Sequence, residues 1–475
     1  MWLDVTTTTV RVTRMEPREE AWITDFLSVS DPKSRFRTGG MIDKLRLFNR
    51  FNNSFPAGLF PLVRKGALAE GFQVDVFDNR GPVVTVDPEA DVAWLRDYQR
   101  AALDAIVAKE RGILRMTTGS GKTEVAIALT RVLPCRWLFL VHRSSLMDQA
   151  ASRYELRTGL GAGRVGEGAF DIPRDTRFIS ATLQTIAAGL KSKDTRVRQL
   201  LDGAQGLVVD EVHSAAADTY FHIIQQCAAR YRVGLSGTPL DRDDNKDIFT
   251  VAALGPIVYR VAAETLIQAG VLARPHIMLA RCEEKSDKPT WQGVYGESVV
   301  RSKRRNSIVV QCAKRAETPC LLVVKEISHG RALVKLLEKQ GIPSAFVYGN
   351  EPLENRKRAI RDVVAGRTQV LVCSVIFQEG QDIPELRSVV VASGGKSTIA
   401  ALQRIGRGMR VSKNKDTFDV YDIADIGCGC VAAAKRGEPE HTGCKWLDKH
   451  TRERLKAYVA EGHATSFLDV HVPST

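Results

Sequence analysis

Residues 112–129 read GILRMTTGSGKTEVAIAL, and this stretch decides the fold. The apolar run Gly112–Met116 is followed by a glycine-containing turn and then by a helical pattern that begins near Glu124. Strand, glycine turn and helix N-terminus together form a phosphate cradle, because glycines let backbone N–H groups approach an anion and the helix end adds positive potential. Lysine adds a point charge there, and threonine adds a hydroxyl for Mg²⁺. The candidate phosphate-binding residues are Thr118, Gly119, Ser120, Gly121, Lys122 and Thr123.

From this stretch onward, short apolar runs alternate with helical patterns along the chain. Such alternation is typical of βαβ units around a parallel sheet. The sequence therefore predicts an α/β fold class with two tandem parallel-sheet lobes, over residues 91–270 and 271–427. The expected strands are 112–116, 137–141, 178–180, 207–209 and 231–235 in the first lobe and 321–324, 344–348, 369–373 and 388–392 in the second.

The flanks of the two lobes differ in composition. Residues 1–90 lack the alternation and contain turn-forming glycines and prolines, so we expect a small N-terminal α+β module there. Residues 428–475 are expected to form a short helical C-terminal extension. Pro275 and the charged stretch that follows it predict a lobe boundary or a surface excursion over residues 272–289.

Two adjacent carboxylates follow another apolar strand of the first lobe. Asp210 and Glu211 come directly after the run Leu207–Val209. Taken alone, such a pair is usually a solvated strand end, but its place in the same lobe as the phosphate cradle favours chemistry. We expect Asp210, together with Thr123, to hold Mg²⁺ and Glu211 to act as the general base.

A basic segment lies in the second lobe. Residues 403–410 read QRIGRGMR and carry arginines at helical spacings, Arg404, Arg407 and Arg410. Charge that develops at a γ-phosphate is best stabilised by a group that arrives from the other lobe on closure. A merely solvated basic helix face gives the same pattern, so the position of the segment in the second lobe is what favours arginine fingers.

Composition narrows the class of partner. Lys and Arg number 68 against 55 acidic residues, which gives a net charge of +13 and a pI of about 9.3. This balance favours a polyanion such as nucleic acid, although a basic protein without such a partner has it too. Nine scattered cysteines indicate a reducing compartment. We find no signal-peptide pattern and no apolar run long enough to cross a bilayer. We therefore expect no membrane partner and a cytoplasmic location.

In chain order, these motifs resemble those of the superfamily 2 DExH helicases over roughly residues 95–425. Residues 95–99, LRDYQ, resemble the upstream motif whose glutamine reads adenine. Residues 210–213 resemble the DExH box, and 235–239, LSGTP, resemble motif III with glycine in place of the usual alanine. Met116 replaces the first glycine of the strict P-loop, a departure common in this superfamily. The resemblance implies base sensing by Gln99, and coupling of nucleotide state to strand separation by His213, Ser236 and Thr238.

The resemblance extends to loops that contact nucleic acid in this superfamily. Residues 139–143 resemble motif Ia, 181–185 the stretch after it, 373–384 motif V and 403–410 the last motif. In the family, such loops touch the phosphodiester backbone or the nucleotide. The resemblance implies strand contacts by Arg143, Thr182, Gln184 and Ser374, nucleotide contacts by Gly380 and Asp382, and catalytic roles for Lys122, Asp210, Glu211, Gln403, Arg407 and Arg410.

The family also implies architecture and partners. It implies two RecA-like lobes that use ATP and Mg²⁺. Within the superfamily, residues 43–59 and 451–458 resemble the phage UvsW-type helicases and their XPB-like relatives. This likeness implies an enzyme that remodels forked or branched DNA, single- or double-stranded, in replication, recombination or repair, in the cytoplasm of the bacterial host if the gene belongs to a phage. A monomer is the default expectation. An RNA helicase, the motor subunit of a restriction-like complex and a DNA-annealing protein with ATP-gated binding stay open as alternatives.

Two clusters lie outside the motor motifs. The N-terminal module interleaves basic residues with phenylalanines that could stack on bases, although some of these rings must form its core. The residues are Lys33, Arg35, Arg37, Lys44, Arg46, Arg50, Arg64 and Lys65, with Phe36, Phe48, Phe51, Phe55 and Phe60.

Near the C-terminus, Cys428, Cys430, His441 and Cys444 offer four soft ligands for zinc, but their spacing differs from common zinc knuckles. Unrelated thiols in a loop are the favoured interpretation there.

Overall fold

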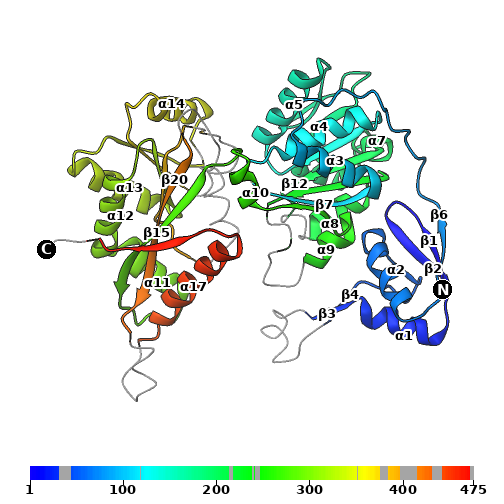
Figure 1. Cartoon of the computed structure of the whole chain (residues 1–475), viewed down its shortest axis with the longest axis horizontal. Coiled ribbons are helices and arrows are strands. Elements are labelled where there is room, and N and C mark those ends of the chain that lie inside the picture. Colours follow the sequence, from blue (N-terminus) through cyan, green and yellow to red (C-terminus); the bar gives the residue numbers. More distant parts are fainter. Residues whose placement is uncertain are drawn as a thin grey trace. The chain divides into compact units, whose positions relative to one another are not determined.

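The computed structural model divides the chain into two compact units, Met1–Val261 and Ala262–Thr475 (Figure 1). It describes residues 1–30, 44–117, 119–212, 218–237, 240, 247–349, 351–374, 383, 385–395, 415–429 and 441–470. Among these residues, no helix is both long enough and apolar enough to cross a membrane.

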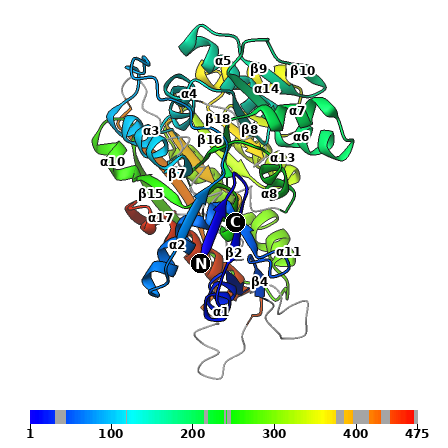
Figure 2. The same ribbon diagram turned by 90° about the vertical axis from the view of Figure 1, so that its right-hand side faces the viewer.

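The first unit begins with the expected α+β module. Its four-stranded sheet has the order β5-β2-β1-β6, with β1 antiparallel to β2 and parallel to β6. Alternate residues of β1 and β2 are buried, as the period of a strand requires, and the two helices pack on that buried face (Figures 1 and 2). The elements are β1 (Trp2–Val5), β2 (Thr9–Arg14), α1 (Pro17–Phe26), β3 (Ser28–Ser30), β4 (Lys44–Arg46), β5 (Ser54–Pro56), η2 (Ala57–Leu59), α2 (Phe60–Ala69) and β6 (Asp75–Asp78).

The module shares its core with the first lobe. Val251 and Ala252 of α9 (Asp247–Leu254) belong to the same apolar cluster as the module's buried side chains. The buried Arg111 donates from Nη2 to the carbonyl oxygen of Thr7 at 2.9 Å. At Gly58, a Cβ atom would lie 2.2 Å from the carbonyl oxygen of Val251, so only glycine permits this approach. The module is therefore docked on the lobe by close backbone packing.

Replacing Gly58 with Ala is expected to destabilise the first unit by about 2 kcal/mol, because the new methyl group must push backbone apart. The change would be measured as the free energy of unfolding in urea. Gly81→Ala is the matched control, since a Cβ at Gly81 meets nothing within 4 Å. Equal stabilities of the two variants would contradict the docking.

The first lobe is an eight-stranded sheet of order β10-β9-β11-β8-β12-β13-β7-β14, parallel except for the β9–β10 hairpin. Helices α6 to α9 pack on one face through the main apolar cluster, and α5 covers the other face, where Tyr154 stacks on Phe178 at 4.8 Å. The elements are α3 (Asp97–Lys109), β7 (Arg111–Met116), α4 (Lys122–Val132), β8 (Trp137–Val141), α5 (Ser144–Thr158), β9 (Gly163–Gly166), β10 (Ala169–Asp171), β11 (Phe178–Thr182), α6 (Leu183–Lys191), α7 (Thr195–Gly203), β12 (Gly206–Asp210), α8 (Asp218–Gln225), β13 (Tyr231–Ser236), α9 and β14 (Ile257–Val261).

The second unit holds a seven-stranded parallel sheet of order β17-β18-β16-β19-β20-β15-β21. Helices α12 and α13 pack on one face through the apolar cluster. The elements are α10 (Ala263–Gln268), β15 (Arg274–Glu284), α11 (Trp291–Val294), η4 (Tyr295–Val300), α12 (Lys303–Arg315), β16 (Cys320–Val324), α13 (Ile327–Lys339), β17 (Ser344–Val347), α14 (Leu353–Val364), β18 (Val370–Ser374), β19 (Ser388–Val391), β20 (Thr417–Gly427), α17 (Cys444–Ala460) and β21 (Thr465–Leu468).

The two sheets confirm the predicted α/β fold with two RecA-like lobes, but the surface excursion expected over residues 272–289 is wrong for most of its length. Residues 274–284 form β15, an interior strand that pairs with β20 along its whole length. Pro275 precedes the stretch Ile277–Ala280 that pairs with β21, so one side of β15 is a sheet edge at this position, and proline is tolerated at sheet edges. Its buried residues Ile277, Leu279, Ala280 and Cys282 carry the strand signal that the flanking charges obscure. The C-terminal extension contains the expected helix and also an unforeseen strand, β21, which pairs with β15.

Candidate functional site

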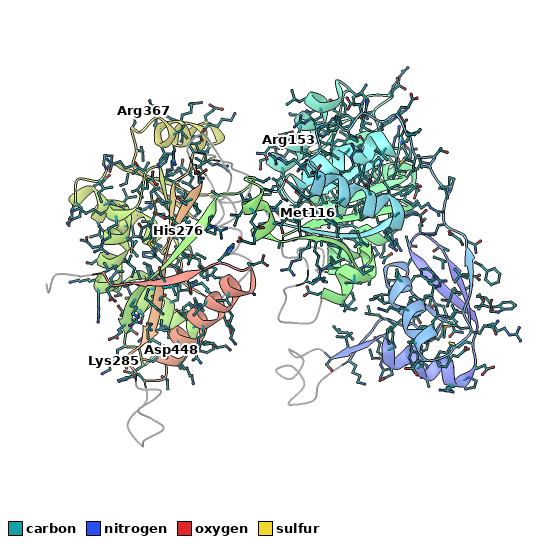
Figure 3. All side chains as sticks on the ribbon, in the orientation of Figure 1. Met116, Arg153, His276, Lys285, Arg367 and Asp448 are labelled. Atoms are coloured by element: carbon teal, nitrogen blue, oxygen red, sulfur yellow. The ribbon has the colours of Figure 1, made fainter. Side chains whose placement is uncertain are left out.

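Three neighbouring strands bring the main candidate residues to one edge of the first sheet. β12, β13 and β7 are adjacent and parallel. Asp210 ends β12, Ser236 ends β13, and the phosphate turn follows Met116 at the end of β7 (Figure 3). The carboxyl ends of parallel strands form the ligand-binding edge of open α/β sheets. The register of the sheet therefore assembles a site from residues far apart in sequence.

The turn after β7 has the backbone of an anion cradle. Gly119 and Gly121 have φ values of 88° and 78°, and Gly121 is the N-cap of α4, which starts at Lys122. Within the described part of the chain, the buried Ser120 Oγ and Lys122 Nζ have no hydrogen-bond partner. Buried donors without partners are rare, and here they lie at a helix N-terminus, where an anion is favoured. These residues fit the phosphates of a nucleotide.

Gln99 supports this turn from behind. Its Nε2 donates to the carbonyl oxygens of Ser120 at 2.9 Å and Gly121 at 3.4 Å, and its Oε1 accepts from the backbone N–H of Arg96. Tyr98 adds a hydrogen bond from its hydroxyl to the Ser120 carbonyl oxygen at 2.7 Å. Gln99 is buried and its amide is fully engaged, so it positions the phosphate turn; adenine sensing by this residue stays a prediction. Tyr98 was missed, although it stands next to Gln99 in the same motif.

Replacing Gly121 with Ala is expected to weaken ATP binding by about tenfold or more. The new Cβ would lie 2.4 Å from Gln99 Nε2, in a left-handed backbone conformation that alanine disfavours. ATP affinity would be measured by calorimetry, together with thermal unfolding. Gly159→Ala is the control that separates the steric clash with Gln99 from the strain of a left-handed backbone. Gly159 has a similar φ of 71°, but a Cβ there would meet nothing within 4 Å. An unchanged dissociation constant for ATP in Gly121→Ala would contradict this account.

The acidic pair lies beside the phosphate turn. Glu211 Oε1 is 3.6 Å from Lys122 Nζ, and Asp210 Oδ1 accepts the backbone N–H of Glu211 at 3.0 Å. Burial, and then the charge of Glu211, raise the pKa of Asp210 to about 6. Glu211 itself has a φ of 51°, a left-handed value uncommon for a residue other than glycine. A metal at Asp210 would favour the ionised carboxylate, so the arrangement suits a bound divalent cation.

The predicted strand-contacting residues gather at neighbouring strand ends. β8 and β11 are parallel, with Val141 opposite Thr182. Arg143 is the N-cap residue of α5, and Thr182 caps α6 by accepting the N–H of Thr185. Gln184 Nε2 donates to the carbonyl oxygen of His142 at 2.8 Å, which ties the two loops together. In the second sheet, Ser374 ends β18 with a buried Oγ that has no hydrogen-bond partner in the described structure.

A charged cluster that the sequence did not reveal links the two helices behind these loops. Glu124, in the first turn of α4, accepts hydrogen bonds from Arg153 at 3.1 Å and Arg157 at 2.9 Å. Both arginines are on α5, and Arg153 is labelled in Figure 3. The helical spacing of the two arginines is visible in the sequence, but their shared partner is not. The cluster therefore joins the phosphate-turn helix to the helix after motif Ia.

Several predicted residues lie outside the described residues, so the structure neither places nor tests them. They are Thr118, His213, Thr238, Gly380, Asp382, Gln403, Arg404, Arg407, Arg410, Cys430, Lys33, Arg35, Arg37 and Phe36.

The flanking clusters are partly explained by packing. In the N-terminal module, Phe48 and Phe55 are buried in the core and Phe60 packs against it, whereas Phe51 is fully exposed. Near the C-terminus, Cys428 Sγ lies 3.6 Å from Cys444 Sγ, and His441 Nδ1 lies 2.6 Å from Asp287 Oδ1. In the described ranges, no three His, Cys, Asp or Glu side chains could hold a metal together. Zinc binding therefore stays untested.

Two family models match the chain in tandem. "Type III restriction enzyme, res subunit" matches residues 93–241, and "Helicase conserved C-terminal domain" matches residues 302–412. The first match contains the phosphate turn and the acidic pair, and the second contains Ser374 and the basic segment 403–410. Helicase domains of this kind imply ATP binding and hydrolysis.

Relatives with curated names are helicases as well. A helicase-named protein of Sulfolobus islandicus filamentous virus is 27% identical and aligns over 69% of this chain and 64% of its own length. DNA 3'-5' translocase XPB2 of Sulfurisphaera tokodaii is 25% identical, over 69% and 81%. ATP-dependent DNA helicase uvsW of Enterobacteria phage T4 is 24% identical, over 90% of each chain. The chain thus spans 64% to 90% of the length of these relatives.

Solved structures agree on the fold. The ATP-dependent Type ISP restriction-modification enzyme LlaBIII, bound to DNA, matches 87% of this chain and 34% of its own with a TM-score of 0.59 and 14% identity. At this identity, the likeness supports the two-lobed architecture alone. Two family models match in order and helicase relatives align along most of the chain, so the resemblance inferred from the motifs is confirmed. The chain belongs to the superfamily 2 helicases, ATP-driven enzymes with two RecA-like lobes, and is similar to their UvsW and XPB-like members.

Proposed function

We propose that this chain is an ATP-dependent DNA helicase or translocase that remodels forked or branched DNA in replication, recombination or repair. The single observation that carries the proposal is the ion pair of Lys122 with Glu211, 3.6 Å apart, beside Asp210 and the phosphate turn. Lysine, metal-binding aspartate and general base are the three groups that ATP hydrolysis needs from one lobe.

The first lobe would bind and hydrolyse ATP. Lys122, freed from Glu211, would contact the β- and γ-phosphates, and the backbone N–H groups of the turn would contact the α- and β-phosphates. Thr123 and Asp210 would hold Mg²⁺, which neutralises phosphate charge. Glu211 would accept the proton of the attacking water. Gln99 would sense adenine, while His213, Ser236 and Thr238 would couple hydrolysis to strand movement.

The second lobe would complete the site when the lobes close on ATP. Gln403, Arg407 and Arg410 would face the γ-phosphate, and Gly380 and Asp382 would lie near the nucleotide. Guanidinium groups that arrive with closure stabilise charge only in the closed state, so hydrolysis would reopen the lobes and move the strand. The division into residues 1–90, 91–270, 271–427 and 428–475 belongs to this proposal.

The strand would run across Arg143, Thr182, Gln184 and Ser374. Such loops contact mainly phosphates, which carry no sequence information and encode sugar preference poorly. The names of the relatives, a DNA translocase and a DNA helicase, support DNA over RNA. Exposed Phe51 and the basic Lys44 and Arg46 would let the N-terminal module grip DNA.

The test is ATP hydrolysis by the wild type with single-stranded DNA, duplex DNA, forked DNA and RNA, together with unwinding of the labelled fork. We expect stimulation by DNA, strongest with forks, and strand separation that requires ATP. Stimulation by RNA alone would contradict the DNA assignment. No stimulation by any of the four would contradict the motor function.

One pair of variants tests whether Arg143 contacts the DNA strand. Arg143→Ala is expected to raise the DNA concentration for half-maximal ATPase stimulation and to reduce its salt dependence by about one counterion, because one phosphate contact is lost. Arg198→Ala is the control, since Arg198 is a half-exposed arginine that pairs with Asp202 and Gln226 on the surface. If the salt dependence of DNA stimulation is the same in the two variants, Arg143 does not contact the DNA strand.

A further inference from the structure

Two cysteines of the second unit lie side by side at the carboxyl end of β20. Cys428 follows Gly427, the last residue of β20, and Cys444 is the first residue of α17. Their Sγ atoms are 3.6 Å apart, although the two residues are separated by 16 positions in the chain. A disulfide joins two sulfur atoms at about 2.05 Å, so the two side chains need to approach each other by only about 1.5 Å to form one.

The backbone beside both cysteines is held by hydrogen bonds to other parts of the second unit. The N–H of Gly427 donates to Asp448 Oδ1 of α17 at 2.9 Å (Figure 3). The N–H of Gly443, next to Cys444, donates to the carbonyl oxygen of Ser286 at 2.8 Å. At Gly427, a Cβ atom would lie 2.7 Å from Cys444 Cβ, so only glycine permits this approach of strand and helix. The short distance between the sulfur atoms therefore follows from how β20 packs on α17.

The two thiols differ in their access to solvent. Cys428 is exposed, whereas Cys444 is buried. Cys444 Sγ also donates to the carbonyl oxygen of Glu284 at 3.7 Å, which holds this sulfur in place. An oxidant reaches the exposed thiol first, and the oxidised sulfur needs a second thiol nearby to form a disulfide. The pair therefore has the arrangement of one reacting thiol and one resolving thiol.

The other cysteines in the described part of the chain are poor targets for an oxidant. They are all buried, namely Cys135, Cys227, Cys282, Cys312, Cys320 and Cys373. Burial raises the pKa of the thiols of Cys135, Cys312 and Cys320 to about 12. These thiols stay protonated, and a protonated thiol is a poor nucleophile. Among the described cysteines, oxidation is therefore directed to Cys428.

We propose that Cys428 and Cys444 are a peroxide-sensitive pair, and that their oxidation to a disulfide fastens the start of α17 to the end of β20. The Cys428 thiolate attacks one oxygen of hydrogen peroxide, the O–O bond breaks, and hydroxide leaves a sulfenic acid on Cys428. The Cys444 thiolate then attacks the sulfenic sulfur, and a second hydroxide leaves as the S–S bond forms. The two hydroxides take up the protons that the two thiols released. Two thiols are thus oxidised while one peroxide is reduced to two water molecules.

The disulfide would close the loop of residues 428–444 without adding a new contact between α17 and β20. The two elements are already joined in the reduced protein, where Thr451 Oγ1 donates to the carbonyl oxygen of Asp425 at 2.8 Å. A cross-link of this kind acts mainly by restricting the unfolded chain. For a loop of this length, we expect oxidation to raise the affected melting transition by roughly 5–10 °C.

The test treats the full chain with hydrogen peroxide and maps its disulfides by mass spectrometry after digestion. We expect a pair of peptides joined through Cys428 and Cys444, and recovery of both thiols with dithiothreitol. Cys444→Ser should instead keep a sulfenic acid on Cys428, which a dimedone probe would label. Cys430→Ser is the matched control, because it removes a neighbouring thiol and should leave the cross-link unchanged. Scanning calorimetry of the full chain should show the higher transition in the oxidised wild type and not in oxidised Cys444→Ser.

Several results would overturn the inference. A disulfide between Cys428 and Cys430, or a sulfonic acid on Cys428 with Cys444 still reduced, would show that the two sulfur atoms do not meet. Zinc in the purified wild type that is lost in Cys428→Ser would assign the pair to a metal. A cross-link that leaves the melting transition unchanged would remove the fastening role. The mapping on the wild type needs no variant to fold, and none of these results depends on ATP hydrolysis, so the proposed function is tested separately.

Discussion

Glu211→Gln is expected to lower kcat for ATP hydrolysis by about 10²- to 10⁴-fold while ATP still binds. Glutamine has the same shape but cannot accept a proton from water. Its amide also removes the charged partner of Lys122, now 3.6 Å away, which leaves the ammonium available to phosphates. We therefore expect ATP affinity to be retained or raised, so the loss should appear in kcat and not in binding.

The measurement is steady-state ATPase with saturating forked DNA, together with ATP binding by calorimetry. Glu167→Gln is a close control, because Glu167 is an exposed glutamate with a φ of 49°, nearly the 51° of Glu211. It reproduces the change of side chain in the same backbone conformation and should hydrolyse ATP like the wild type. Turnover by Glu211→Gln within threefold of wild type would assign the base to another residue.

The parallel sheets explain why so much of this site could be predicted from sequence. Once the runs 112–116, 207–209 and 231–235 are taken as parallel strands, the residues that follow them must meet at one edge. β12, β13 and β7 are neighbours in the sheet, as that argument requires. Strand order and register depend on packing across the whole sheet, so no local motif predicts them. They set the distance of 3.6 Å between Lys122 Nζ and Glu211 Oε1.

The features that sequence reasoning missed have long-range causes. β15 has charges and a proline in its sequence, and only its pairing with β20 and β21 shows that it is an interior strand. Arg454 fits the pattern of a surface arginine on a helix until Asp422, on β20, gives it a buried partner. Gln99 also holds the phosphate turn through hydrogen bonds to Ser120 and Gly121, a contact of α3 with that turn which the motif did not predict. Partners distant in the chain decide each of these cases.

Asp210→Asn is expected to abolish most hydrolysis and, at the same time, to stabilise the nucleotide-free protein. Loss of a metal ligand removes several kcal/mol of charge stabilisation, so kcat should fall by at least about a hundredfold. The gain in stability follows from the pKa of Asp210, which burial and then the charge of Glu211 raise to about 6. The carboxylate is therefore harder to ionise in the folded protein than in the unfolded chain, whose aspartates titrate near pH 4.

The pH dependence gives the sign of this effect. Between about pH 4 and pH 6 the folded protein holds a proton that the unfolded chain has lost, so the stability of the wild type falls as pH rises through this window. Above pH 6 the full free-energy penalty of ionising buried Asp210 is present, about 3 kcal/mol, and asparagine removes this penalty because it carries no charge. Asp210→Asn should therefore unfold at a higher temperature than the wild type at pH 8 and lose this advantage near pH 4.

Thermal unfolding of both proteins from pH 4 to pH 8, without nucleotide or metal, would measure the effect. Asp148→Asn, at a mostly exposed aspartate, should change stability by less than about 0.5 kcal/mol at every pH. A lower stability of Asp210→Asn at pH 8, or a gain that does not vary with pH, would show that Asp210 is not held against its own ionisation. If Asp210→Asn is more stable than the wild type only at high pH and also loses turnover, the charge of Asp210 destabilises the nucleotide-free site. Such a charge is retained because it binds the metal.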